Sequence, residues 1–484
     1  MTDLINNGWT IARSALLTHQ QRLTVTANNI ANVNTPGYAR RIVQLATVQE
    51  TPTSIHETRT YSNGVGVRVA DVVRAQSSAL QNLLRRQAGD TQGHDTRAKA
   101  LADLESLLQA GEGSSLNTKL DAFWNSWYDL SNQAENTALR NVVVLRGADL
   151  AQTLNSLYGR IEDFEQQIIS GSPGSFTGQL PSDVETFNDL TKQLQDLNAR
   201  ISYSLSSFDP YSLMDRRETL LKELGALADI QVGADYSVTL DGATVVSGNG
   251  ATRAELAVTS GGPPATFELD GAPVAIASGS LGAWSDVLDI AAGMRDRLDT
   301  LAVDVMNAVN DIHNSDRNLA GDTYDLTGER CTWDFFTGTG ASDIAVETSI
   351  YDPTRPLEMN SQLVAAAASR YDAGPPPVPN TGDGAIALQI ADLAGQARAA
   401  LGGQTFGSYH TTGLTLLGNL VQTEKALAED GAAIMDSLEN ALQAEIGVDM
   451  DEELMTMLQA QRAYESAAKV LSTIDEMIRT ILQL

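Results

Sequence analysis

Few residues of this 484-residue sequence stand in patterns that could support metal binding. An H-E-x-x-H zinc motif begins at His56, but Thr60 stands where the second histidine ligand is required. A segment similar to a calcium-binding loop begins at Asp316. Ala320 occupies its fifth position, and Thr327 replaces the bidentate glutamate that the twelfth position needs. Neither segment therefore predicts a metal site.

Patterns for nucleophilic catalysis or cofactor binding are equally sparse. The sequence contains no G-x-S-x-G elbow, no P-loop and no G-x-G-x-x-G segment. The five histidines are scattered at wide spacings: His19, His56, His94, His313 and His410. Sequence alone leaves a triad of distant residues open, but no residue points to one. We therefore expect no catalytic residue, no cofactor and no metal ion.

The charge balance restricts the partners of the chain. Lys and Arg number 32 against 61 Asp and Glu, which gives a net charge of −29. Nucleic acid and anionic membrane would both repel such a chain, so we expect neither as its main partner. No apolar run reaches the ~18 residues of a membrane-spanning helix. Asp3 and Arg13 interrupt the N-terminal apolar residues, so we also expect no cleaved secretory signal. The single cysteine, Cys331, excludes an intramolecular disulfide and is interpreted as a buried thiol.

The elements that could position a functional surface are clearest at the N-terminus. Apolar residues recur there at alternating three- and four-residue steps, which predicts one stripe of a helix: Ile5, Trp9, Ala12, Leu16, Leu23, Ile30 and Val33. The helix must end near Asn34, because Pro36 cannot continue it and disfavours α conformation in the residue before it. Pro36 and Gly37 predict the centre of a type II turn. The expected turn comprises Asn34, Thr35, Pro36, Gly37 and Tyr38.

A second stripe occupies the C-terminus. Two sets of residues recur there every seven positions: Met457, Tyr464, Leu471 and Ile478, and Ala460, Ala467, Ile474 and Ile481. A repeat of this kind over four heptads predicts a coiled-coil seam. No proline or glycine interrupts it after Gly447.

The two terminal stripes are natural partners. Residues 1–48 contain four arginines against one aspartate, whereas residues 449–484 contain seven acids against three bases. Opposite charge favours their pairing, although exposed ion pairs contribute little individually. We predict an assembly interface made of Ile5, Trp9, Leu16, Leu23, Ile30, Val33, Met457, Tyr464, Leu471, Ile474, Ile478 and Ile481. The alternative is that each helix lies on the surface of an ordinary globular core.

Segments around both stripes resemble a known family. Residues 28–38, NNIANVNTPGY, resemble the N-terminal signature of bacterial flagellar rod, hook and hook-associated axial proteins. Residues 447–471, with GVD, QRAY and KVL, are similar to their C-terminal signature. Rod and hook proteins pass from the turn into mostly β domains. Here a helical block follows, and its segments 120–130, 139–144 and 215–224 resemble the hook-associated branch of the family.

The resemblance implies a structural protein at the junction between hook and filament, secreted through the flagellar type III export apparatus and assembled by its terminal helices. Implied partners are further copies in a ring at the hook tip, the hook protein, a second hook–filament junction protein and an export chaperone. One alternative is another axial protein, of the hook or distal rod. A second alternative, from a different class, is an axial scaffold that carries a wall-hydrolase activity.

The order of the segments predicts a mainly α fold with paired N- and C-terminal coiled-coil helices, a long helical-bundle domain and a small inserted all-β domain. The expected division is as follows: residues 1–40 form the N-terminal helix and turn, 41–228 and 284–448 the two parts of the bundle, 229–283 the β-rich insert, and 449–484 the C-terminal helix. A strip of loops and strands is expected at 315–380. Asp241-Gly242 and Asp270-Gly271 are hairpin signals within the insert.

The terminal helices should be marginal on their own. Burial along one helix pair gains less free energy than the ordering of both backbones costs. We therefore expect the termini to be largely disordered in the monomer and to fold on assembly.

Overall fold

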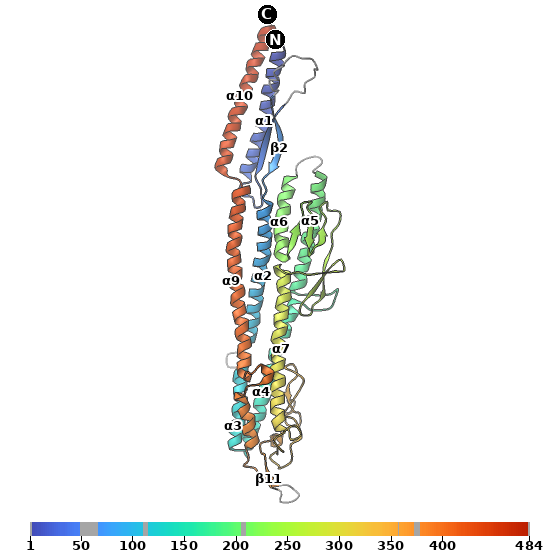
Figure 1. The fold of residues 1–484 in the computed structure, drawn as a ribbon, viewed down its shortest axis with the longest axis vertical. Coiled ribbons are helices and arrows are strands. Elements are labelled where there is room, and N and C mark those ends of the chain that lie inside the picture. The colour runs from blue at the N-terminus through green and yellow to red at the C-terminus, as the bar shows by residue number, and fades with distance from the viewer. Residues whose placement is uncertain are drawn as a thin grey trace. The chain divides into compact units, whose positions relative to one another are not determined.

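A computed structural model of the chain describes residues 2–48, 66–109, 115–204, 210–356, 358–371 and 378–482, with side chains from residue 7 to 480 apart from residue 379. Figure 1 shows that long helices dominate, so the predicted mainly α class is confirmed. The chain forms two compact units. Unit 1 comprises 1–89, 188–254 and 430–484, and unit 2 comprises 90–187 and 255–429. The five-segment division given above stays a prediction.

Ten α-helices are present in the described part of the chain: α1 Thr2–Ala31, α2 Ser78–Gln109, α3 Leu116–Asn132, α4 Thr137–Ile168, α5 Gln179–Ser204, α6 Tyr211–Leu227, α7 Gly279–His313, α8 Ala385–Asp392, α9 Phe406–Ile446 and α10 Met450–Leu482. The helices α2, α5 and α9 contribute residues to both units.

Unit 1 is built around the pairing of α1 with α10. The two helices run antiparallel, with both chain ends at the same tip (Figure 1). A two-stranded antiparallel hairpin, β1 (Arg41–Thr47) and β2 (Val67–Arg74), packs against α1. The Thr18 hydroxyl of α1 donates to the Val67 carbonyl at 3.0 Å, and the Val67 amide donates to Ser14 Oγ at 3.2 Å. These bonds join one edge of the hairpin to the helix.

A buried arginine organises the rest of unit 1. Arg217 of α6 donates to Asn198 Oδ1 of α5 at 2.9 Å and to the Tyr236 carbonyl at 2.8 Å. Its guanidinium also lies 5.0 Å from the centre of the Tyr236 ring. Tyr236 precedes the second strand of the sheet β3 (Ile230–Val232), β4 (Val238–Leu240) and β5 (Ala243–Val246). One side chain therefore joins two helices to the sheet.

Unit 2 has an aromatic core. The apolar residues of α3 recur at helical spacing, and Ser115 caps the helix by accepting a hydrogen bond from the Thr118 amide at 3.3 Å. Phe123 and Trp127 of α3 are fully buried and contact Phe335, with ring centroids 5.9 and 5.3 Å apart. Phe336 packs edge-on against Phe335. Helices α4, α7 and α8 complete the packing around this cluster.

The residues of the predicted β-rich insert form two separate sheets. The strands β3, β4 and β5 belong to unit 1, whereas β6 (Leu256–Ser260), β7 (Thr266–Leu269) and β8 (Ala272–Val274) form a second three-stranded antiparallel sheet in unit 2. Both Asp-Gly signals lie at hairpin turns. All four of their residues have positive φ, as a type I′ turn requires: Asp241, Gly242, Asp270 and Gly271.

The strip from 315 to 371 is fixed to unit 2 by buried polar groups. It contains β9 (Phe336–Thr337), β10 (Ala345–Val346) and β11 (Arg370–Tyr371), and β11 pairs with β12 (Val378–Pro379). His313 Nδ1 lies 3.2 Å from the Trp333 carbonyl, and Nε2 accepts from the Ala365 amide at 3.0 Å. Burial lowers the pKa of His313 to about 4, so the ring is neutral near pH 7. Cys331 is a buried free thiol, as expected, and burial raises its pKa to about 12.

Candidate assembly interface

The seam between α1 and α10 consists largely of small side chains. Ala12 of α1 and Ala460 and Ala467 of α10 are buried. Gly8 faces Ile474, since a Cβ placed on Gly8 would lie 3.4 Å from Ile474 Cδ1. Small residues at a contact let two helix axes approach closely. Apart from Ile474, the seam therefore buries mainly small side chains.

The predicted interface residues flank this seam. Ile474 is buried, while nine others are half-buried: Trp9, Leu16, Leu23, Ile30, Val33, Met457, Tyr464, Leu471 and Ile478. The side chains of Ile5 and Ile481 lie outside the described part of the chain. One partner helix thus covers only part of each stripe. Contact between these residues and a neighbouring subunit stays a prediction.

A further apolar surface of unit 1 was missed from the sequence. Met450, Leu454 and Leu458 of α10 are exposed, as are Ile42 and Leu45 of β1. The predicted heptad stripe begins at Met457, one repeat after Met450, and Leu454 and Leu458 lie outside its two registers. Their spacing of four and again four residues is the signal that could have found them.

The predicted turn has the expected geometry. The Tyr38 amide donates to the Thr35 carbonyl at 3.2 Å, and Gly37 has a φ of 77°, as the third residue of a type II turn requires. Asn34, Thr35, Pro36 and Gly37 are exposed, whereas Tyr38 is half-buried.

Asn29 closes this turn onto α1. It is buried, and its Oδ1 accepts from the Tyr38 hydroxyl at 2.8 Å and from the Arg41 amide at 3.1 Å. Its Nδ2 donates to the Arg41 carbonyl at 2.9 Å. Both ends of the Asn29 amide are therefore satisfied by the turn and by the first residue of β1. This geometry gives a physical reason for asparagine at this position of the signature segment.

The same turn contacts α6. A Cβ on Gly37 would lie 2.9 Å from Thr219 Oγ1, so a larger residue would crowd this contact as well as adopt an unfavourable φ. Arg41 lies over the rings of Tyr38 and Tyr211, at 5.0 and 5.7 Å. The turn is thus fixed from α1 on one side and from α6 on the other.

Asp215 of α6 completes the contact between α6 and the hairpin. It pairs with Arg74 of β2 at 2.7 Å and lies 3.8 Å from Arg41. Burial raises the pKa of Asp215 even though Arg74 opposes the shift.

Arg40 joins the turn to the junction between α9 and α10. Its amide donates to the Ile446 carbonyl at 2.8 Å, which satisfies the last residue of α9. Its guanidinium pairs with Glu453 at 2.7 Å and with Glu452 at 2.9 Å, both in the first turn of α10. Asp449 caps α10 by accepting from the Glu452 amide at 3.1 Å. The two signature segments therefore build one structural joint.

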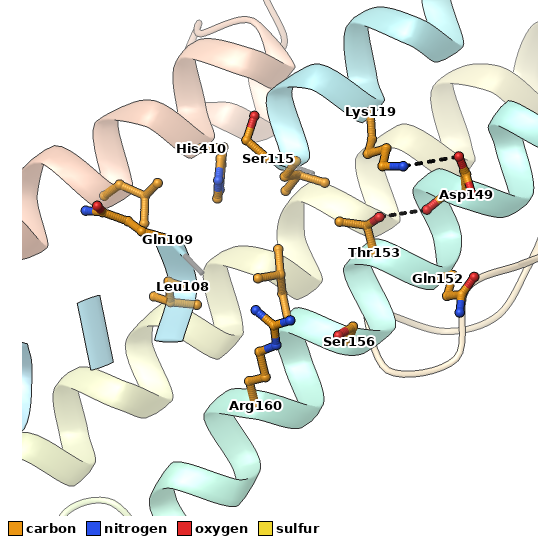
Figure 2. A pocket seen from close by; sticks show the side chains of 13 residues that line it. Leu108, Gln109, Ser115, Lys119, Asp149, Gln152, Thr153, Ser156, Arg160 and His410 are labelled. Carbon is orange, nitrogen blue, oxygen red and sulfur yellow. Dashed lines mark hydrogen bonds and ion pairs between the residues drawn. The ribbon is translucent and has the colours of Figure 1, made fainter. Parts of the chain in front are cut away.

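Unit 2 contains a polar cavity of about 370 Å³, which offers a test of the enzyme alternative (Figure 2). Ser115, Asp149 and His410 all line it. Asp149 pairs with Lys119 at 3.2 Å, and Ser115 caps α3. Burial, with the nearby charge of Arg297, lowers the pKa of His410 to about 4. Within the described residues, His410 makes no hydrogen bond to the serine or the aspartate, so the three do not form a triad.

The metal-like segments give no site in the described part of the chain. No three His, Cys, Asp or Glu residues there are arranged to bind a metal ion. Asp316 and Asp322 each pair with Arg330 at 2.6 Å, so a cation would have to displace the arginine. His56 and Thr60 lie outside the described residues. Among the described helices, none has the length and hydropathy needed to span a membrane.

Three family models match the chain. Residues 101–326 match the helical domain of flagellar hook-associated protein FlgK. Residues 10–38 match the flagella basal body rod protein family, and residues 445–484 match the C-terminal region of the flagellar basal body rod FlgEFG proteins. The terminal matches cover the turn, the α9–α10 junction and most of both paired helices.

Whole-chain relatives agree with these matches. Flagellar hook-associated protein 1 of Bacillus subtilis strain 168 is 27% identical over 520 aligned positions, which cover 98% of this chain and 97% of the relative. The Escherichia coli K12 protein of the same name is 22% identical, with both chains fully covered. The Salmonella typhimurium protein is 28% identical over 274 positions, or 55% of this chain and 46% of the relative.

A solved structure supports the fold. The flagellar hook junction protein FlgK from Burkholderia pseudomallei aligns with a TM-score of 0.55 at 16% identity, over 75% of this chain and 99% of that chain. The relatives are structural proteins of the flagellum and not enzymes. The resemblance noted from the two signature segments is thereby confirmed. The helical-domain match, the relatives that cover the whole chain and the solved structure together support identification as a flagellar hook-associated protein 1, with a structural role among the axial components of the bacterial flagellum.

Proposed function

We propose that this chain forms the junction between hook and filament and assembles there through its terminal helix pair. The observation that carries this proposal is the partial cover of the predicted stripes. A seam of small residues pairs α1 with α10, while larger residues such as Trp9, Leu23 and Leu471 remain half-buried beside it. Further burial of these side chains between copies would stabilise an assembly by roughly 1–2 kcal/mol for each residue.

The joint around Arg40 gives the helix pair a fixed direction. It ties α1, α6, α9 and α10 together through the turn, so the pair leaves the rest of unit 1 at a defined angle. Copies with the same joint would place their helix pairs alike around one axis. We propose a ring at the hook tip, with the hook protein on one side and a second junction protein on the other.

The proposal includes export in an extended form. Termini that are disordered in the monomer would pass through the type III export apparatus and would pair on arrival, outside the cell. An export chaperone would cover the apolar C-terminal stripe before export. The terminal signature matches and the small size of the side chains buried in the seam support this part of the proposal.

The test uses charge substitutions in the seam. Trp9→Asp would place a carboxylate in the half-buried stripe beside the seam, and Ile474→Asp would place one within the seam; each should abolish junction assembly. Gln20→Asp, at an exposed position of α1, is the matched control and should assemble normally. The measurements are the fraction of cells with attached filaments and the thermal unfolding of the purified chains, in which unit 2 should be unchanged. Normal filaments in both seam variants would contradict the proposal.

The position of the labelled chain on detached hook–basal bodies separates the junction from other axial locations. Label at the distal hook tip is the expected result. Label along the hook or at the rod would support a hook or distal rod protein instead. The match of residues 101–326 to the hook-associated helical domain favours the junction.

A further inference from the structure

Two uncovered apolar surfaces of unit 1 complement each other, and we propose that they meet between neighbouring copies of this chain. The first is the outer stripe of α10, made of Met450, Leu454 and Leu458. The second is formed by the exposed apolar residues of β1, Ile42 and Leu45, which lie on either side of the register shift between Gln44 and Leu45. The inference rests on the proposed assembly through the terminal helices and specifies which surfaces join.

The outer stripe lies away from α1. Its three residues are spaced four apart, so they share one helix face. Leu454 and Leu458 are 43% and 55% exposed, whereas Glu453 and Ala460, which face the joint and the seam, are buried. The face of α10 that α1 leaves uncovered thus begins with three apolar side chains within about two turns.

The hairpin offers two exposed apolar side chains. Ile42 and Leu45 are 46% and 42% exposed. The hairpin is already anchored to α1 through Val67 and to α6 through the Tyr211 hydroxyl, which donates to the Val72 carbonyl. Its exposed apolar residues are therefore presented on a fixed support.

Both surfaces lie at the same height along the helix pair. Arg40 bonds Glu453 at the base of α10, and β1 starts at the next residue. Farther along, Gly8 faces Ile474. In an antiparallel pair with equal rise, Thr18 then lies opposite position 464, and Thr18 is bonded to Val67 of the hairpin. The hairpin consequently spans the levels of residues 453 to 464, which include Leu454 and Leu458.

Rotation about an axis parallel to the helix pair leaves the position of each residue along that axis unchanged. Copies related by such a rotation bring surfaces of equal height together. A contact between two different patches of one chain closes a ring or continues as a helix. The two patches therefore have the arrangement that a heterologous contact needs.

Charges at the rims of the patches complement each other. Arg68 of β2 is exposed and, within the described residues, has no ion pair. Glu465 continues the α10 stripe, is exposed, and accepts only a hydrogen bond from Gln461 in the described part of the chain. Arg68 follows Val67, so it lies at the height of Glu465. Opposite charges at matching heights favour a second copy as the occupant of the α10 stripe.

A cysteine pair tests the contact. Cys331 is the only native cysteine and is buried, so Leu45→Cys with Leu458→Cys adds the only accessible thiols among the described residues. Oxidation of hook–basal bodies that carry the double variant should give covalent dimers and higher multiples of this chain. Each single variant should remain monomeric and serves as a control.

Normal filaments without covalent dimers or higher multiples of this chain would overturn the contact between the α10 stripe and the hairpin. This result would leave the proposed function intact. Cross-links to another axial protein alone would also overturn it. Absence of every variant and of the unsubstituted chain from the hook tip would instead overturn the proposed function.

Charge reversal gives an independent test. Arg68→Glu and Glu465→Arg should each weaken assembly about tenfold, since each places like charges together. The double reversal should restore the original level in the filament-attachment assay. A double variant no better than the weaker single variant would contradict the pairing.

Discussion

The core of unit 2 and the α1–α10 seam are both helical, but they are stabilised differently. Phe123 and Trp127 are fully enclosed by aromatic neighbours from the same unit. The seam has alanines and a glycine at its centre, with its larger side chains half-covered at the edges. The first region is complete within one chain. The second is suited to contact with a neighbour, so its stability should depend on assembly.

The largest effect should come from the aromatic core. Phe123→Ala should lower the free energy of unfolding of unit 2 by about 3–5 kcal/mol, because it removes a fully buried ring and leaves a cavity. Thermal unfolding of the purified chain measures this loss. Leu416→Ala, at a 58% exposed position of the same unit, is the control and should change stability by less than about 0.5 kcal/mol.

Acid should destabilise unit 2 through His313. The buried ring has a pKa of about 4 instead of 6.5, so the unfolded chain binds this proton first as the pH falls. The contribution of neutral His313 to the free energy of unfolding is fully present above pH 6.5. This free energy should fall by roughly 3 kcal/mol between pH 6.5 and 4. The comparison of unfolding against pH for the unsubstituted chain and His313→Asn isolates this residue. Parallel curves would show that His313 does not contribute.

The joint in unit 1 offers a matched pair of acids. Glu453→Ala should cost about 1–3 kcal/mol, because it removes the nearly buried partner of Arg40. Glu452→Ala removes an exposed partner of the same guanidinium and should cost less than about 1 kcal/mol. Hydrogen exchange of the first turns of α10 distinguishes the two variants. Equal effects would mean that burial does not decide the strength of the pair.

The hydroxyl of Tyr38 should have a smaller effect. Tyr38→Phe removes one hydrogen bond to Asn29 while keeping the ring under Arg41, and should cost about 1 kcal/mol. Asn29→Ala removes three bonds and should cost more. Exchange rates of the Tyr38 and Arg41 amides measure both. Unchanged exchange rates in Asn29→Ala would contradict the role of this residue in closing the turn.

Hydrogen exchange across the whole chain tests whether the terminal helices, unlike the aromatic core, depend on assembly for their stability. In dilute monomer, amides of α1 and α10 should exchange much faster than those of α3 and α4, and assembly should protect them. If the terminal helices were already as protected as the aromatic core at low concentration, assembly-dependent folding would be wrong.

The sequence predicted local features better than pairings between distant segments. The heptads identified both terminal helices, and Pro36 with Gly37 identified the turn, because each signal depends on neighbouring residues. The β-rich segment divides into two sheets because β5 and β6 do not pair, and composition does not encode this break between two sets of consecutive hairpins. The role of Asn29 was likewise hidden, because its partners become visible only when the turn folds back.

The outer stripe of α10 escaped detection for a different reason. Met450, Leu454 and Leu458 follow a regular spacing, but the stronger seven-residue repeat occupies the same helix. A helix with two apolar faces carries two periodic signals, and here the seven-residue repeat masks the four-residue spacing.

The bond from the Arg40 amide to the Ile446 carbonyl has a consequence for synthesis of the chain. The end of α9 is capped by a residue made more than 400 positions earlier, and Glu453 comes later still. Until the chain has been synthesised through Glu453, the Arg40 amide and guanidinium can bond only to water or to other groups, so the joint cannot form before that point. A product that ends before Ile446 lacks both partners of Arg40 and cannot build the joint.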